Sequence, residues 1–162
     1  MNEKQENQQT QPGLSINAQY IKDLSFETPL MPQILGDMKQ APQVDIKVDV
    51  NAAKLNDNGM YTVDLKFNIE TKSGDKVLFL CELDYGSVVT LNLPEEHIEP
   101  VLLIEVPRYL FPFARNIVAD VTRESSLPPL MIAPIDFVDL YRRRKGINPE
   151  SASENPENKS VN

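Results

Sequence analysis

The sequence has little of the side-chain chemistry on which most catalytic and metal sites depend. Its 162 residues include one cysteine, Cys81, one histidine, His97, and no tryptophan. A His/Cys zinc site or a Cys–His catalytic pair would therefore have no spare ligand. A single cysteine also excludes an intrachain disulfide and favours a reducing compartment such as the cytoplasm. We interpret His97 as exposed or helix-capping and Cys81 as a small buried apolar residue.

Glycine-rich loops and long apolar runs are absent as well. None of the six glycines has the spacing of a phosphate-binding loop, so we expect no nucleotide, no cofactor and no ATP dependence. The longest apolar run, residues 101–104, is too short to cross a bilayer, and residues 1–13 lack the apolar core of a secretion signal. The net charge of -8 disfavours nucleic acid and anionic lipid and favours a basic partner.

The composition indicates one folded domain between two polar ends. Residues 1–13 and 148–162 are rich in Asn, Gln, Ser, Glu and Pro, and we expect both to be disordered. The segment 14–147 contains nearly all of the large apolar residues and is predicted to form the domain.

Alternating apolar and polar residues predict four strands in the first part of this domain. The pattern covers residues 16–27, 44–50, 61–69 and 77–93. In the first of these, Ile16, Tyr20 and Leu24 share one face, and Asp23 and Glu27 share the other. Turn residues at 56–59 and 73–75 predict hairpins between the last three, and hence an antiparallel sheet with one buried face. Gly86 suggests a bulge or a bend. The first connection, residues 28–42, is unusually apolar for a solvent-exposed loop.

Helical spacing replaces the strand pattern after Leu93. We expect a short helix to about Ile104, a longer helix that starts near Pro112, and a last helix capped by Asp136. The longer helix has apolar residues on two sides, which predicts a subunit interface. The predicted interface residues are Phe113, Ile117, Val118 and Val121. Strands followed by helices give an α+β fold with helices packed on one face of the sheet.

Two groups of charged residues allow alternative interpretations. The carboxylate pairs Asp23 with Glu27 and Glu82 with Asp84 could serve acid catalysis, but acids on an exposed sheet face more often keep it soluble. The basic run 142–145 could dock RNA or anionic lipid, or it could simply complement the dipole at the end of the last helix.

Several segments resemble the SecB family of protein-export chaperones, in the family's order. They are YIKDLSFE at 20–27, FLCE at 79–82, LFPFAR at 110–115, LMIAPIDF at 130–137 and LY at 140–141. The chain departs from the family at residues 124–127, ESSL, where the family usually has glycine and an aromatic residue. The exit of the long helix is therefore expected to be shaped differently.

The resemblance implies a dimer of dimers that holds unfolded secretory precursors without nucleotide and delivers them to SecA. It places Asp23, Glu27, Leu80 and Glu82 on an outer surface that receives SecA's basic, zinc-bearing C-terminal segment, while the chain itself holds no metal. For the client groove we expect apolar residues from the first loop, one strand and the last helix. They are Leu30, Met31, Ile34, Leu35, Ile46, Val48, Phe137, Leu140 and Tyr141. The alternatives are an acidic adaptor for one folded partner and a small enzyme.

Overall fold

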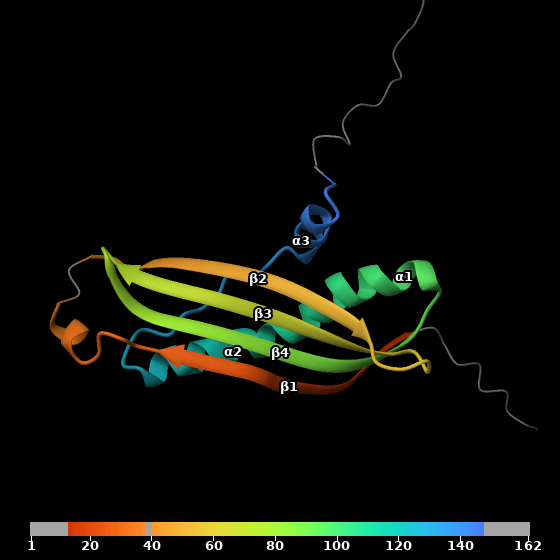
Figure 1. Cartoon of the computed structure of the whole chain (residues 1–162), viewed down its shortest axis with the longest axis horizontal. Coiled ribbons are helices and arrows are strands. Elements are labelled where there is room, and N and C mark those ends of the chain that lie inside the picture. The colour runs from red at the N-terminus through yellow and green to blue at the C-terminus, as the bar shows by residue number, and fades with distance from the viewer. Residues whose placement is uncertain (1–12, 38–39, 148–162) are drawn as a thin grey trace, which may run out of the picture.

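Four long antiparallel strands form the centre of the protein (Figure 1). The structure, a computed structural model, describes residues 13–37 and 40–147. The strands are β1 (Gly13–Glu27), β2 (Gln43–Lys54), β3 (Met60–Ser73) and β4 (Lys76–Asn92). Their order in the sheet is β1-β4-β3-β2, so the first loop crosses from one edge to the other. The predicted antiparallel sheet is confirmed. β1 begins at Gly13, three residues before the predicted strand and one residue before the predicted start of the domain. The rest of the predicted disordered ends, 1–12 and 148–162, lies outside the described residues.

One face of the sheet is apolar and buried, as the alternation predicted. On β3, Val63, Leu65, Phe67 and Ile69 are buried, while Lys66 and Asn68 between them face the other side. Register pairs Phe67 with Leu83 and Ile69 with Cys81, so the buried face continues across β4. The opposite face is polar and is called the outer face below.

β1 changes face twice along its length. Register shifts leave Asn17 and Lys22 without a paired residue on β4. Tyr20 therefore lies on the outer face, although the simple alternation placed it with Ile16 and Leu24. Gly86 of β4 lies directly opposite Tyr20, and a Cβ at Gly86 would meet the Tyr20 ring at 2.7 Å. Neither ladder of β4 shifts register at Gly86, so of the bulge or bend suggested there the bulge is wrong. Glycine there allows a close approach of the ring.

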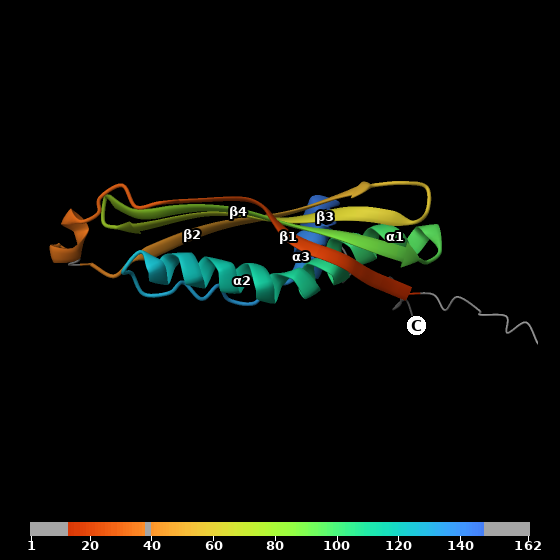
Figure 2. The same cartoon turned by 90° about the horizontal axis from the view of Figure 1, so that it is seen from below.

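The apolar face is covered by one nearly continuous helical run. It consists of α1 (Glu95–Pro100), a π-helical turn η2 (Val101–Glu105) and α2 (Val106–Glu124). The expected break before Pro112 is wrong, because Pro112 lies inside α2 rather than in its first turn. Figure 2 shows α2 running along this face of the sheet. None of the described helices is long and apolar enough to cross a membrane.

The last helix, α3 (Phe137–Arg144), begins at the predicted cap. Asp136 Oδ1 accepts a hydrogen bond from the Asp139 amide at 3.0 Å. Phe111 of α2 lies between Phe67 of the sheet and Phe137 of α3, with ring centroids 6.4 and 6.3 Å apart. α3 lies beside the β2 edge, where Arg144 donates a hydrogen bond to the Val50 carbonyl. A short 3-10 helix, η1 (Gln33–Gly36), follows β1.

We expect Gly59→Ala to destabilise the protein by more than 1 kcal/mol, on the order of the cost of a left-handed non-glycine residue plus a steric overlap. Gly59 has φ +74°, and a Cβ there would lie 2.6 Å from the Leu91 carbonyl oxygen. Gly146→Ala is the matched control, since Gly146 has φ +69° but no atom within 4 Å of the added Cβ. Urea denaturation at one protein concentration measures both. Equal losses in the two variants would show that the overlap with Leu91 has no effect.

Candidate functional site

The four predicted docking residues come together on the outer face of the sheet. In the β1–β4 ladder, Glu27 pairs with Leu80, and Asp23 pairs with Asp84, two residues beyond Glu82. Because side chains alternate between faces, all of these residues point away from α2. The shared face of Asp23 and Glu27 is as predicted. Leu80 is the apolar member of the group and is half-buried.

The charges of this outer face are only partly neutralised within the protein. Lys66 binds Asp84 at 3.0 Å and Lys22 binds Asp64 at 2.5 Å, whereas Asp23, Glu27 and Glu82 form no ion pair with other described residues. Glu82 accepts one hydrogen bond, from the Asn68 amide at 3.2 Å. A hollow of about 310 Å³ lies beside Asp23 and Glu82. The surface can therefore receive a cationic group in a shallow depression.

The residues expected to form one client groove are divided between two places. Ile46, Val48 and Leu140 line a hollow of about 420 Å³ at the β2 edge, and Leu140 and Tyr141 line a neighbouring one of about 240 Å³. The expected groove residues of the first loop lie around η1 at one end of the sheet, whereas α3 lies beside the middle of the sheet (Figure 1). Leu30 and Met31 are half-buried there and Leu35 is exposed. The expected placement of the first loop opposite the last helix is wrong.

Two of the expected groove residues belong to the protein core. Ile34 is 2% exposed and Phe137 is 1% exposed, so neither side chain has surface to offer a client. Ile34 covers one end of the sheet core, and Phe137 packs edge-on against Phe111. Both residues pack in the core, so their assignment to the client groove is corrected.

An apolar pocket that the sequence analysis missed lies beneath the segment that follows α2. It has a volume of about 380 Å³ and is lined mainly by aliphatic and aromatic side chains and by prolines. The lining residues are Gln40, Pro42, Val44, Thr71, Leu78, Phe79, Leu127, Pro128, Pro129 and Leu130. A register shift in β4 leaves Leu78 unpaired, so that both Leu78 and Phe79 are buried under this segment. The signal in the sequence was the proline pair enclosed by leucines.

The predicted interface residues of α2 are not equally available to a partner. Phe113 is 52% exposed, and Ile117 and Val121 are half-buried. Val118 is 0% exposed and packs against the sheet, so its assignment to an interface is corrected. Tyr109, one turn before Phe113, is also exposed and was missed by the sequence analysis. Helical spacing alone did not reveal which of the two apolar stripes faces the sheet.

The remaining reactive side chains are placed for structure rather than chemistry. Burial raises the pKa of the Cys81 thiol to about 11, and the nearby Glu82 carboxylate contributes, so the thiol stays protonated and unreactive near neutral pH. His97 is exposed beside Glu96. In the basic run, Arg143 pairs with Asp139 at 2.6 Å and Lys145 with Glu99 at 2.7 Å, which supports an internal role for these cations.

Comparison with known proteins assigns the chain to a class and to a family. A family model described as preprotein translocase subunit SecB matches residues 7–147. The protein-export protein SecB of Rhodospirillum rubrum is 53% identical over 146 residues, which cover 90% of this chain and 91% of that protein. SecB of Paramagnetospirillum magneticum is 56% identical over 134 residues, 82% of this chain and 86% of the relative. The molecule is thus a chaperone of protein export and not an enzyme. It belongs to the SecB family.

A solved structure supports the fold. The SecB-like chaperone of Mycobacterium tuberculosis, in complex with a ChAD peptide from the HigA1 antitoxin, superimposes with a TM-score of 0.64 at 15% identity. The match covers 75% of this chain and 90% of that chain. At this identity the likeness concerns the arrangement of the sheet and the long helix.

Proposed function

We propose that this export chaperone acts in the cytoplasm without ATP, holds unfolded precursors in the apolar pocket, and passes them to SecA docked on the outer face. The observation that carries the proposal is the separation of two unlike surfaces on opposite sides of one sheet. The apolar pocket lies under residues 127–130. The carboxylates of Asp23, Glu27 and Glu82, which form no ion pair with other described residues, lie on the outer face.

The chemistry of the pocket suits an unfolded client. Its volume of about 380 Å³ accommodates one or two large apolar side chains, which folded proteins bury and unfolded ones expose. The pocket opens beside Val44 at the beginning of β2, an edge strand whose outer backbone groups have no strand partner. The hollow beside Ile46, Val48 and Leu140 continues along the same edge, and a long extended segment would contact both.

The outer face suits a basic partner rather than a client. Exposed carboxylates attract cations over a distance of about 10 Å at ordinary salt concentration, but bind apolar side chains poorly. Leu80 adds a small apolar contact among the acids, and the neighbouring hollow provides a concave surface for a side chain of the partner. This combination supports Asp23, Glu27, Leu80 and Glu82 as the contact for SecA's basic C-terminal segment.

The exposed side of α2 supports assembly of the protomers into a dimer of dimers. Tyr109 and Phe113 are each more than half exposed, at 57% and 52%, one turn apart on the side of α2 that faces away from the sheet. Large aromatic side chains are typical of the centre of subunit interfaces. Ile117 and Val121 extend the same surface towards the end of the helix.

Val44→Asp is expected to weaken the binding of an unfolded precursor about ten-fold, because it places a charge at the mouth of the apolar pocket. Val44 is 44% exposed, so the change should not disturb the core. Leu55→Asp is the matched control, since Leu55 is 51% exposed but lies in the β2–β3 turn, away from the pocket. Calorimetric titration with a reduced, unfolded precursor provides the measurement. Equal affinity in both variants would remove the pocket from client binding.

Glu82→Lys is expected to abolish most of the affinity for SecA's C-terminal peptide while precursor binding stays unchanged. Glu124→Lys makes the same change of charge at the exposed end of α2 and should leave both affinities near wild type. Because the carboxylates are exposed, the wild-type affinity for the peptide should also fall as salt is raised. Unchanged peptide affinity in Glu82→Lys would refute the docking assignment.

The double variant Phe113→Asp/Ile117→Asp is expected to dissociate at micromolar concentration, because two carboxylates would be buried at the proposed interface. Size-exclusion chromatography with light scattering gives the mass of the assembly. Wild type should have the mass of four protomers and the variant that of two or one. Retention of the wild-type mass by the variant would place the interface elsewhere.

A further inference from the structure

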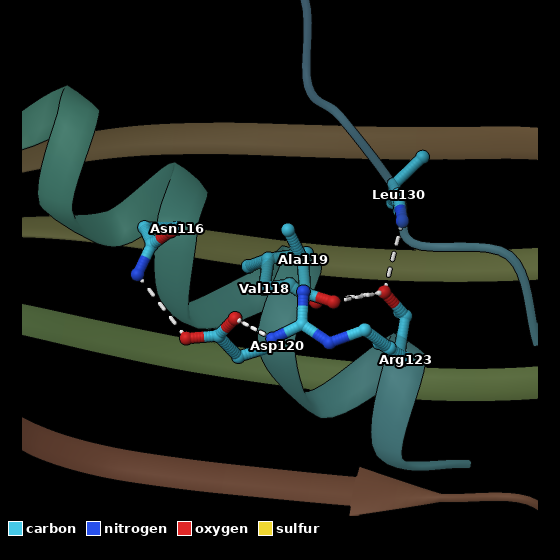
Figure 3. A network of polar contacts seen from close by, with 7 residues as sticks. Asn116, Val118, Ala119, Asp120, Arg123 and Leu130 are labelled. Atoms are coloured by element: carbon cyan, nitrogen blue, oxygen red, sulfur yellow. Dashed lines mark hydrogen bonds and ion pairs between the residues drawn. The ribbon is translucent and has the colours of Figure 1, made fainter. Parts of the chain in front are cut away.

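The end of α2 carries a buried hydroxyl that bonds outside its own helix. Thr122 is completely buried, and its Oγ1 donates to the carbonyl of Val118 or of Ala119, at 2.9 and 3.0 Å. The same oxygen accepts a hydrogen bond from the Leu130 amide at 2.9 Å. Figure 3 shows the segment of Leu130 passing beside the last turns of α2, with its amide nitrogen directed at the helix. The hydroxyl of a threonine inside a helix normally hydrogen-bonds only to the backbone of that helix, so this second bond is unusual.

This hydrogen bond ties the segment that forms the pocket wall, residues 127–135, to α2. Between residues 127 and 135, it is the only hydrogen bond to another element that the described part of the chain contains. Three prolines in this segment, at positions 128, 129 and 134, have no amide hydrogen to donate. Leu127 and Ile132 are held by burial alone. Apolar burial is not directional, so the hydrogen bond is what defines the position of the backbone.

The position of Leu130 matters because Pro129 and Leu130 line the apolar pocket. Leu127 and Pro128 line it as well. Because proline has a restricted φ angle, the two prolines limit the backbone conformations between Leu127 and Leu130. On the other side of the pocket are Val44, Thr71 and Phe79, which the strand ladders hold in place, and Leu78, which has no strand partner but is buried. Gln40 and Pro42 of the first loop complete the lining. The wall after α2 is not part of the sheet, so the strand ladders do not fix its position.

We propose that Thr122 is a positioning residue for client binding: through the Leu130 amide it holds the wall of the pocket after α2 at the separation that fits a client side chain. The proposal rests on the client-binding role of the pocket given above. Without the acceptor, the Leu130 amide would have to turn towards water to find a partner, since a buried unpaired N–H is costly. Pro129 and Leu130 would turn with it and change the shape of the pocket.

The test compares two substitutions of similar size. Thr122→Val keeps the branched shape but removes the acceptor, whereas Thr122→Ser keeps the hydroxyl. With the full-length chain and a reduced, unfolded precursor, we expect Thr122→Val to lower the affinity about ten-fold and Thr122→Ser to remain within about two-fold of wild type. Hydrogen exchange at the Leu130 amide should accelerate in Thr122→Val alone. Affinity for SecA's C-terminal peptide should stay at the wild-type value in both variants.

A double variant separates positioning from a general loss of stability. If Thr122 acts through the pocket, Thr122→Val should add little to Val44→Asp, because both damage the same site. Full addition of the two effects, or parallel loss of peptide binding, would show a merely structural role and overturn the proposal. So would wild-type client affinity in Thr122→Val when Leu130 exchange is accelerated. If Val44→Asp itself has no effect on client affinity, the pocket does not bind clients, and the proposed function fails together with this inference.

Discussion

The covering of one apolar sheet face by one long helical run determines the rest of the structure. Each fully buried aliphatic or aromatic side chain in this contact contributes roughly 1.5–3 kcal/mol, far more than any ion pair on the surface. Leu110, Ala114 and Val118 are completely buried against the sheet, and this fixes the rotation of α2 about its axis. Tyr109 and Phe113 are then left on the opposite side of the helix. The same contact leaves the other face of the sheet to solvent, where charged residues can accumulate.

The apolar pocket arises where this covering ends. After Glu124 the chain turns back along α2 towards α3 instead of continuing over the sheet (Figure 2). The apolar residues at the start of β4 and at the edge of β2 are therefore covered by an irregular, proline-rich segment rather than by a helix. Such a segment packs less completely than a helix does, and a pocket remains. The β-sheet separates the apolar pocket from the acidic outer face, so the roles proposed for the two surfaces can change independently.

The sequence predicts secondary structure and the buried side of an element well where neighbouring residues determine them. It predicts them poorly where contacts with distant segments decide. Alternation on β3 and β4 identified the buried face, and the spacing of Asp23 and Glu27 within β1 placed both carboxylates on one face. Tyr20 was placed on the wrong face because two bulges in β1 are invisible to a period of two. Val118 was misassigned because both stripes of α2 are equally apolar in sequence. The pocket was missed because four separate segments form it, and no local pattern shows that they meet.

The departure at residues 124–127 shows how the helix exit is formed without glycine. Ser126 adopts φ 65°, a left-handed conformation that costs a non-glycine residue roughly 1 kcal/mol or more. The Thr122 carbonyl at the helix end accepts hydrogen bonds from the Ser125 amide, at 3.2 Å, and from Ser125 Oγ, at 2.6 Å, and these bonds offset part of this cost. The left-handed residue reverses the chain so that Leu127 enters the core and the proline pair follows directly. A glycine at position 126 would make the same turn with less backbone strain but with more conformational freedom of the backbone. Serine thus restricts the hinge from which the pocket wall begins, and Thr122 fixes the same wall three residues after Leu127.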